Sequence, residues 1–248
     1  MKDRKEILAL AGLILYIAGV LIGTVFFGFT VWGDYEAAMF DASLGSDKRL
    51  TTLRCPILIN SKETGTVTVT VDNPTVEPVE RLINTSKSGG FVTSILRESQ
   101  RISLAPGETK QVQWTVSQED AAWGHFILNR VYLVRHHPQP SRSGSCGVLT
   151  ANLGIFTGNQ VVAIIFVTSV AFILTGWLTW LRNNRPLSER NRIAAQAMGW
   201  LAGVVLAGMI AGLLGWWVLG AFLLVAAVLL MVVIAGGDPV PPLVKAGG

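Results

Sequence analysis

The sequence contains few side chains that could bind a metal or carry electrons. They are three histidines and two cysteines: His125, His136, His137, Cys55 and Cys146. A blue-copper site needs one His early in its domain and a Cys followed closely by a second His, usually with a Met. No His follows Cys146, and the next methionine, Met198, lies in an apolar segment. We therefore expect solvated histidines, with no metal ion and no other cofactor.

Signatures of enzymes are also missing from the sequence. The phosphate-binding pattern G-x-x-x-x-G-K-[ST], the nucleophile pattern G-x-S-x-G and the zinc pattern H-E-x-x-H do not occur. The long apolar runs contain no His, Asp, Glu, Lys or Arg. Haem in a helical bundle needs axial ligands such as His, and proton or ion relays place ionisable groups at membrane depth. We expect no catalytic residues and no such chemistry from this chain alone.

Three long uncharged runs predict the elements that organise the chain. They cover residues 7–32, 160–181 and 193–235. At about 1.5 Å per residue, the third run would form a helix of roughly 65 Å, twice a hydrocarbon core of ~30 Å, so it must fold back. Gly215 followed by two Trp residues marks the break, because Gly loosens a helix and Trp favours the interface. We expect four transmembrane helices, in residues 1–33, 158–182, 193–214 and 216–235.

Basic residues beside these runs predict the topology. Three precede the first span and four lie at or in the loop 183–192: Lys2, Arg4, Lys5, Arg182, Arg185, Arg190 and Arg192. The positive-inside rule places both groups in the cytoplasm, so residues 34–157 are extracytoplasmic and the tail 236–248 is cytoplasmic. We expect a plasma or inner membrane of a bacterial cell. A cleaved signal peptide is the alternative for the first span, but its apolar run is about twice the usual length.

The charge distribution also bears on partners. Residues 34–157 contain 12 acidic and 12 basic side chains, so the formal net charge of +4 comes from the termini and the 183–192 loop. Nucleic acid binding needs clustered charge on a folded face, and we expect none. The arginines of the loop are instead placed to meet anionic lipid headgroups.

Residues 51–153 read as β structure almost throughout. Residues 66–71 alternate Thr and Val, residues 104–108 form a Pro-Gly turn, and residues 126–134 are apolar on both faces, as in a central strand. With the 67–71 strand ending in Asn73 and Pro74, these features resemble bacterial immunoglobulin-like and fibronectin-like modules, over about 40% of the chain. The resemblance implies an all-β immunoglobulin-like sandwich of about seven strands, inserted between the first and second helices. The Cys–Trp–Cys spacing of antibody domains is absent.

The two cysteines lie at the two ends of this domain. Their even count and their place on the oxidising side of the membrane predict a disulfide between Cys55 and Cys146. Closing a loop of this length contributes up to ~4–5 kcal/mol in the chain-entropy model. Two free buried thiols are the alternative.

Small residues four positions apart recur in the apolar runs. The pairs are Gly19 with Gly23, Gly199 with Gly203, and Gly208 with Gly212. Such pairs let helices approach closely, either within the chain or against a partner.

These features favour a non-enzymatic accessory or scaffold subunit of a larger membrane complex, possibly respiratory, photosynthetic or transport. Its partners would be other integral membrane subunits and lipid. The alternative is a stand-alone envelope protein whose β domain binds a ligand, a glycan or an adhesion partner. A third class is an enzyme subunit that donates a residue to a shared site.

Overall fold

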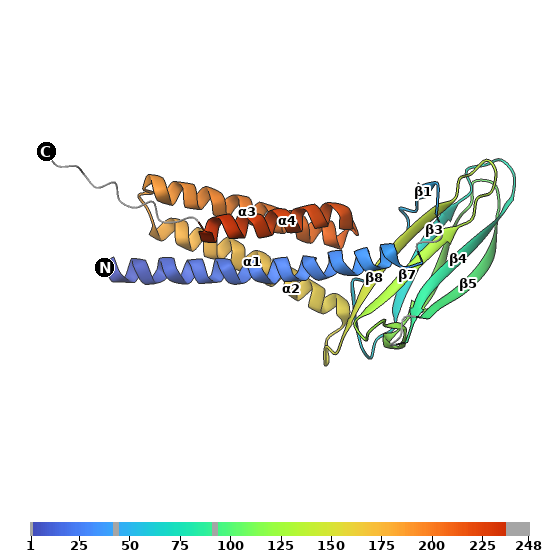
Figure 1. The fold of residues 1–248 in the computed structure, drawn as a ribbon, viewed down its shortest axis with the longest axis horizontal. Helices are drawn as coiled ribbons and strands as arrows, with labels where there is room; N and C mark the ends of the chain where they lie inside the picture. The colour runs from blue at the N-terminus through green and yellow to red at the C-terminus, as the bar shows by residue number, and fades with distance from the viewer. Residues whose placement is uncertain (1, 42–44, 91–93, 237–248) are drawn as a thin grey trace.

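The computed structural model describes residues 2–41, 45–90 and 94–236. Figure 1 shows an elongated molecule with helices at one end and a β domain at the other. The chain begins with α1 (Lys2–Met39), forms the β domain, and returns through α2 (Gly158–Asn183), α3 (Glu189–Leu213) and α4 (Trp217–Gly236). All four helices are long and apolar enough to cross a membrane. The expected tail 236–248 lies outside the described residues apart from Gly236.

The β domain contains two sheets. The larger, mixed sheet has the order β1 (Lys48–Arg49), β8 (Arg142–Ala151), β7 (Phe126–Leu133), β4 (Val79–Gly89) and β5 (Ser94–Leu104), and β2 (Leu58–Asn60) also pairs with β8. The smaller sheet is the antiparallel pair β3 (Gly65–Asp72) and β6 (Thr109–Val116), followed by the short 3-10 helix η1 (Gln118–Asp120). Strands β1 and β2 run parallel to β8, which makes the larger sheet mixed.

The two sheets share an apolar core. As the alternation predicts, Val67, Val69 and Val71 of β3 are buried, and the threonines between them are more exposed. Val69 and Val71 pack in one cluster with Ile83 of the larger sheet. Strand β5 pairs with β4 and β6 pairs with β3, so the turn at residues 105–108 connects two sheets instead of closing a hairpin.

Helix α1 extends beyond its apolar run. It continues past residue 33 to Met39 and has 38 residues, which is roughly 57 Å at about 1.5 Å per residue. Its last turn buries Ala37, and Phe40 follows directly, in a cluster with Ala122 and Leu128 of the β domain. Because burial of this patch stabilises the last turns, one helix belongs to both halves of the molecule (Figure 1).

Glycines allow α1 and α2 to pack with their backbones close together. A Cβ atom on Gly19 would lie 2.7 Å from the amide nitrogen of Ile173, and one on Gly12 would lie 2.8 Å from that of Trp180. The Ser169 hydroxyl donates to the Gly19 carbonyl at 2.8 Å. Neither position has room for a side chain without separating the two helices.

We predict that Gly19→Ala destabilises the folded chain by about 1–3 kcal/mol, because the new methyl group would overpack the contact with α2. The matched control is Gly28→Ala on the same helix, where the nearest atom, Leu224 Cδ1, is 3.8 Å from the new Cβ. Thermal unfolding of both variants in a neutral detergent checks the prediction. Equal midpoints for the two variants would contradict it.

Candidate functional site

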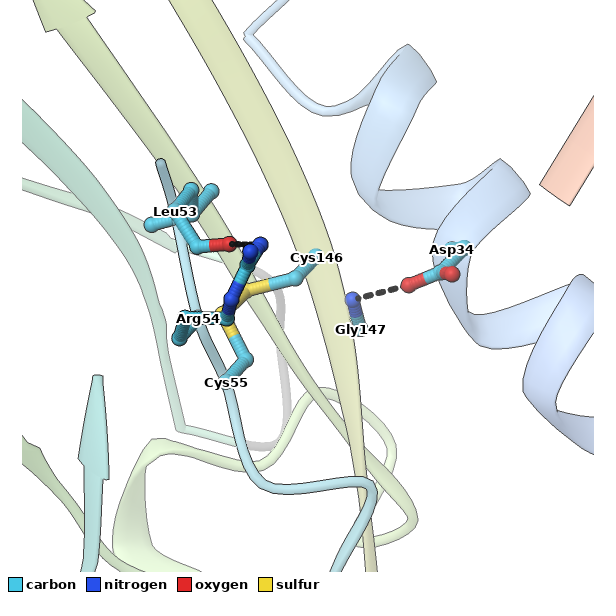
Figure 2. The surroundings of a disulfide bond; sticks show 6 residues. All are labelled: Asp34, Leu53, Arg54, Cys55, Cys146 and Gly147. Atoms are coloured by element: carbon cyan, nitrogen blue, oxygen red, sulfur yellow. Dashed lines mark hydrogen bonds between the residues drawn. A yellow bond between two sulfur atoms is a disulfide. The ribbon is translucent and has the colours of Figure 1, made fainter. Parts of the chain in front are cut away.

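The helices meet the β domain where α1 crosses strand β8. A Cβ atom on Gly147 would collide with the backbone of Gly33, so the main chain of α1 directly contacts the main chain of β8. Next to this contact, the Asp34 carboxylate accepts a hydrogen bond from the Gly147 amide at 3.1 Å. Asp34 is only 8% exposed. Figure 2 shows its side chain reaching from the helix to the strand.

Asp34 fills a gap along one edge of β8. Strand β1 pairs with β8 at Arg142 and Ser143, and β2 pairs with it at residues 149–151. Between these two short strands, the described residues form no strand that pairs with β8 at Gly147, and the Asp34 carboxylate accepts the hydrogen bond of the Gly147 amide instead. An unmet amide in a half-buried position costs free energy, so this carboxylate helps to hold α1 against the sheet.

The disulfide between Cys55 and Cys146 closes the same edge. The two Cα atoms are 6.5 Å apart and the residues are 91 positions apart in the sequence. The bond joins the segment before β2 to the strand β8, one residue before Gly147 (Figure 2). The crosslink therefore lies beside the point where α1 contacts the β domain.

A cavity of about 550 Å³ lies at this junction. We call it the junction cavity. Its wall comes from the end of α1, the segment from β1 to the cysteine, the strands β7 and β8, and the turn between α3 and α4. Lining residues include Asp34, Arg49, Arg54, Cys55, Arg130, Cys146, Leu214 and Trp216. The cavity thus combines charged groups from the β domain with apolar groups from the helical turn.

Three arginines make this wall basic. Arg49 Nη2 donates to the Gly215 carbonyl at 3.0 Å and so joins β1 to the turn between α3 and α4. Arg54 Nη1 donates to the carbonyls of Thr51 and Leu53, at 3.0 and 3.2 Å. Among the residues that the structure describes, no carboxylate lies within ion-pair distance of either of these two guanidinium groups.

The third arginine holds the end of α1. Arg130 Nη1 donates to the carbonyls of Ala38 and Phe40, at 3.4 and 3.2 Å. Positive charge near the last carbonyls of a helix is favourable, because those carbonyls carry the negative end of the helix dipole. Arg130 thus contributes both to the cavity wall and to the position of α1.

Aromatic rings gather at the same level of the helices. The centroids of Trp32 and Tyr35 on α1 are 6.2 Å apart, and those of Tyr35 and Trp217 of α4 are 6.0 Å apart. Trp216, which lines the junction cavity, precedes the last of these residues. The ends of α1 and α4 next to the β domain therefore carry one aromatic cluster beside the cavity.

Two charged side chains of the β domain outside the junction cavity, Asp47 and Arg81, have shifted pKa values. Hydrogen bonds from the hydroxyl and amide of Ser141, together with the nearby Arg135, hold the pKa of Asp47 below its ordinary value. Burial lowers the pKa of Arg81, which is 1% exposed and donates to the side chain of Gln139. Neither Asp47 nor Arg81 lines the junction cavity.

The small-residue positions lie in different surroundings. A Cβ on Gly23 would lie 2.7 Å from Val205, one on Gly208 would lie 2.9 Å from Phe27, and one on Gly212 would overlap the Thr30 hydroxyl. Gly19 faces α2, as described above, and a Cβ on Gly199 would be in ordinary contact with Trp177 at 3.4 Å. Gly203 differs, since no described atom lies within 4 Å of its Cβ position.

The three histidines do not come together. His125, His136 and His137 are all exposed. Within the part of the chain that the structure describes, no group of three or more His, Cys, Asp or Glu side chains is placed to hold a metal ion.

Sequence reasoning missed the junction residues. Asp34, Arg49, Arg54 and Arg130 are far apart in the sequence, and no motif connects them. The one available signal was that Asp34 is the first charged residue after the first apolar run. Its burial depends on the continuation of α1 into the β domain.

No protein-family model matches this chain, and no curated protein matches it. Several solved structures resemble part of it. A β-glucosidase from Listeria innocua is 18% identical, with 43% of this chain and 16% of that chain covered and a TM-score of 0.30. The CARDB domain of a Pyrococcus furiosus protein is 11% identical, with coverages of 40% and 84% and a TM-score of 0.30.

A cycloisomaltooligosaccharide glucanotransferase from Paenibacillus sp. is 13% identical, with coverages of 43% and 14% and a TM-score of 0.32. The chain thus spans less than one fifth of the length of the two carbohydrate-active enzymes. Similarities with such low scores do not bear on the activity of this chain.

We predict that removing the disulfide, by Cys55→Ser with Cys146→Ser, destabilises the β domain by about 2–5 kcal/mol, because the long loop gains freedom when unfolded. Denaturant unfolding of the double variant beside the wild type measures the change. Non-reducing peptide mapping of untreated protein should recover one crosslinked pair. Two thiols that alkylate without reduction would refute the bond itself.

Proposed function

We propose that this chain is a multi-pass membrane protein and a non-enzymatic accessory or scaffold subunit of a larger membrane complex. The observation that carries the proposal is the apolar outer surface of the helices. On α4 alone, large apolar side chains are 46–72% exposed: Leu219, Phe222, Val225, Leu229, Val232 and Val233. In water such a continuous surface would aggregate, whereas lipid or partner helices would cover it.

The aromatic cluster supports a particular depth in the membrane. Trp and Tyr concentrate at membrane–water interfaces. The rings of Trp32, Tyr35 and Trp217 lie where the helices meet the β domain. We infer that this level is the outer interface and that the last turns of α1 project beyond the lipid.

We further propose that the β domain is an extracytoplasmic immunoglobulin-like sandwich. Two sheets with a shared core support this architecture. The crossover from β5 to β6 at residues 105–108 supports it as well, because sandwiches pass repeatedly from one sheet to the other. The disulfide suits an oxidising compartment.

This topology is tested with single cysteines added at Asn84 and Asn183. We predict that a membrane-impermeant maleimide labels the residue-84 cysteine in intact cells and labels the residue-183 cysteine only after lysis. The reason is that basic residues in the 183–192 loop should keep this loop in the cytoplasm. The native cysteines are bonded to each other and do not compete. Outer labelling of the residue-183 cysteine would overturn the topology.

The face of α3 that carries Gly203 is the strongest candidate for contact with a partner helix. Trp200, Gly203, Ala207 and Ile210 are all exposed and recur at helical spacing along one side. Two small residues between larger ones allow a neighbouring helix to approach closely. Gly208 of the same helix faces inward, against Phe27.

These opposite orientations give a matched pair of variants. We predict that Gly203→Leu reduces recovery of stoichiometric partners in mild detergent at least about fivefold, while the isolated chain keeps its thermal stability, because the new side chain enters the contact between subunits. Gly208→Leu should instead lower stability, because it overpacks the bundle. Full partner recovery with Gly203→Leu would exclude this face.

A stand-alone envelope protein is the second candidate function. A cavity of about 610 Å³ lies in the β domain and is lined in part by Trp114 and Asn129. Asn129 is 5% exposed, and its Nδ2 has no hydrogen-bond partner among the described residues. An aromatic surface beside an unmet amide suits a polar ligand. A monodisperse monomer after mild-detergent purification would favour this candidate over the accessory subunit.

A further inference from the structure

We propose that the junction cavity binds the phosphate-bearing headgroup of a membrane lipid. The proposal rests on the membrane insertion proposed above, and it goes further by assigning a ligand class to a site. Three features carry it: the charges of the wall, its apolar side and its level on the helices.

The charged part of the wall suits a phosphate group. Arg49, Arg54 and Arg130 line the cavity, and Asp34 is the one acidic residue in its described lining. One Asp34 oxygen accepts a hydrogen bond from the Gly147 amide, and the Arg49 guanidinium acts on the same carboxylate electrostatically. Three guanidinium groups against one carboxylate still leave the lining with an excess of positive charge, and guanidinium groups bind phosphate oxygens through two parallel hydrogen bonds.

Two of these guanidinium groups are available to a ligand. Arg49 and Arg54 are exposed, and the hydrogen bonds described above go to backbone carbonyls through one nitrogen of each guanidinium group. A guanidinium has five N–H donors, so each keeps donors for a further acceptor. Helix α4 begins at Trp217, also in the wall, and its first turn adds partial positive charge.

The apolar part of the wall selects a lipid over a small soluble anion. Leu213, Leu214 and Trp216 belong to the lining and are 37%, 52% and 51% exposed. They connect the cavity to the apolar sides of α3 and α4, along which an acyl chain can leave. A volume of about 550 Å³ is within the usual range for small-ligand sites, roughly 300–1,000 Å³.

The level of the cavity agrees with this ligand. The Trp32, Tyr35 and Trp217 cluster lies beside it, and these residue types favour the headgroup region of a bilayer. A headgroup bound here would contact the β domain and the helices together. Lipid would then strengthen the junction that Asp34 and the disulfide already hold.

The test is a lipid titration of the purified full chain in a neutral detergent, followed by native mass spectrometry. The probes are dioleoyl phosphatidylglycerol, an uncharged galactosyl diacylglycerol with the same acyl chains, and free glycerol phosphate. We expect the phosphatidylglycerol to bind at least about tenfold more tightly than either of the others. Losing one charge-assisted contact should weaken binding about tenfold or more, so Arg54→Gln should show that loss.

Matched variants complete the design. Arg49→Gln should weaken binding similarly, but it also removes the bond to Gly215 that joins β1 to the turn between α3 and α4. Arg54→Gln removes only bonds to the neighbouring carbonyls of Thr51 and Leu53, so it is the cleaner arm. Arg101→Gln removes the same charge from exposed strand β5, away from the cavity, and should bind as the wild type does.

Three results would overturn the proposal: wild-type binding by Arg54→Gln, equal binding of the uncharged lipid, or equal binding of free glycerol phosphate. The last would make the cavity a soluble-anion site. Alkaline extraction of membranes separates this failure from that of the proposed function. A chain that stays in the membrane but binds no phospholipid refutes only the lipid site, and a chain that washes off refutes the membrane assignment itself.

Discussion

The contact between α1 and strand β8 is the constraint on which the rest of the structure depends. At this contact the backbones of Gly33 and Gly147 touch, and no side chain fits between them. The Asp34 carboxylate then reaches the Gly147 amide, and Ala37 is buried one turn later. Because α1 is one continuous helix, this contact sets the position of the β domain on the helices (Figure 1).

The short strands β1 and β2 explain why a cavity forms beside this contact. Each covers one part of the β8 edge, and the stretch between them is left to a carboxylate and a disulfide. A full-length strand there would have satisfied the backbone but filled the space. The interrupted edge instead leaves room that Arg49 and Arg54 line from one side and the turn between α3 and α4 lines from the other.

The glycines of the helices fall into two groups, those in contacts within the chain and one on an exposed face. Gly19, Gly23 and Gly208 lie where other elements of this chain approach, so their lack of a side chain serves the internal fold. Gly203 lies on an open face of α3. Glycines that pack inside the bundle and a glycine on an exposed face serve different contacts, and the accessory-subunit proposal relies on the exposed one.

The sequence by itself determined the four long apolar helices, the break near Gly215 and the alternating β3 strand, because hydrophobic periodicity and run length are local properties. It also identified the two cysteines that the structure joins. Only the tertiary structure decided that α1 continues to Met39, that residues 105–108 connect two sheets, and that Gly203 faces outward while Gly208 faces Phe27. The junction cavity was also decided only by the tertiary structure, because Asp34, the arginines and the turn between α3 and α4 meet only when distant segments pack together. Local patterns record which face of an element is apolar, but not which element will cover it.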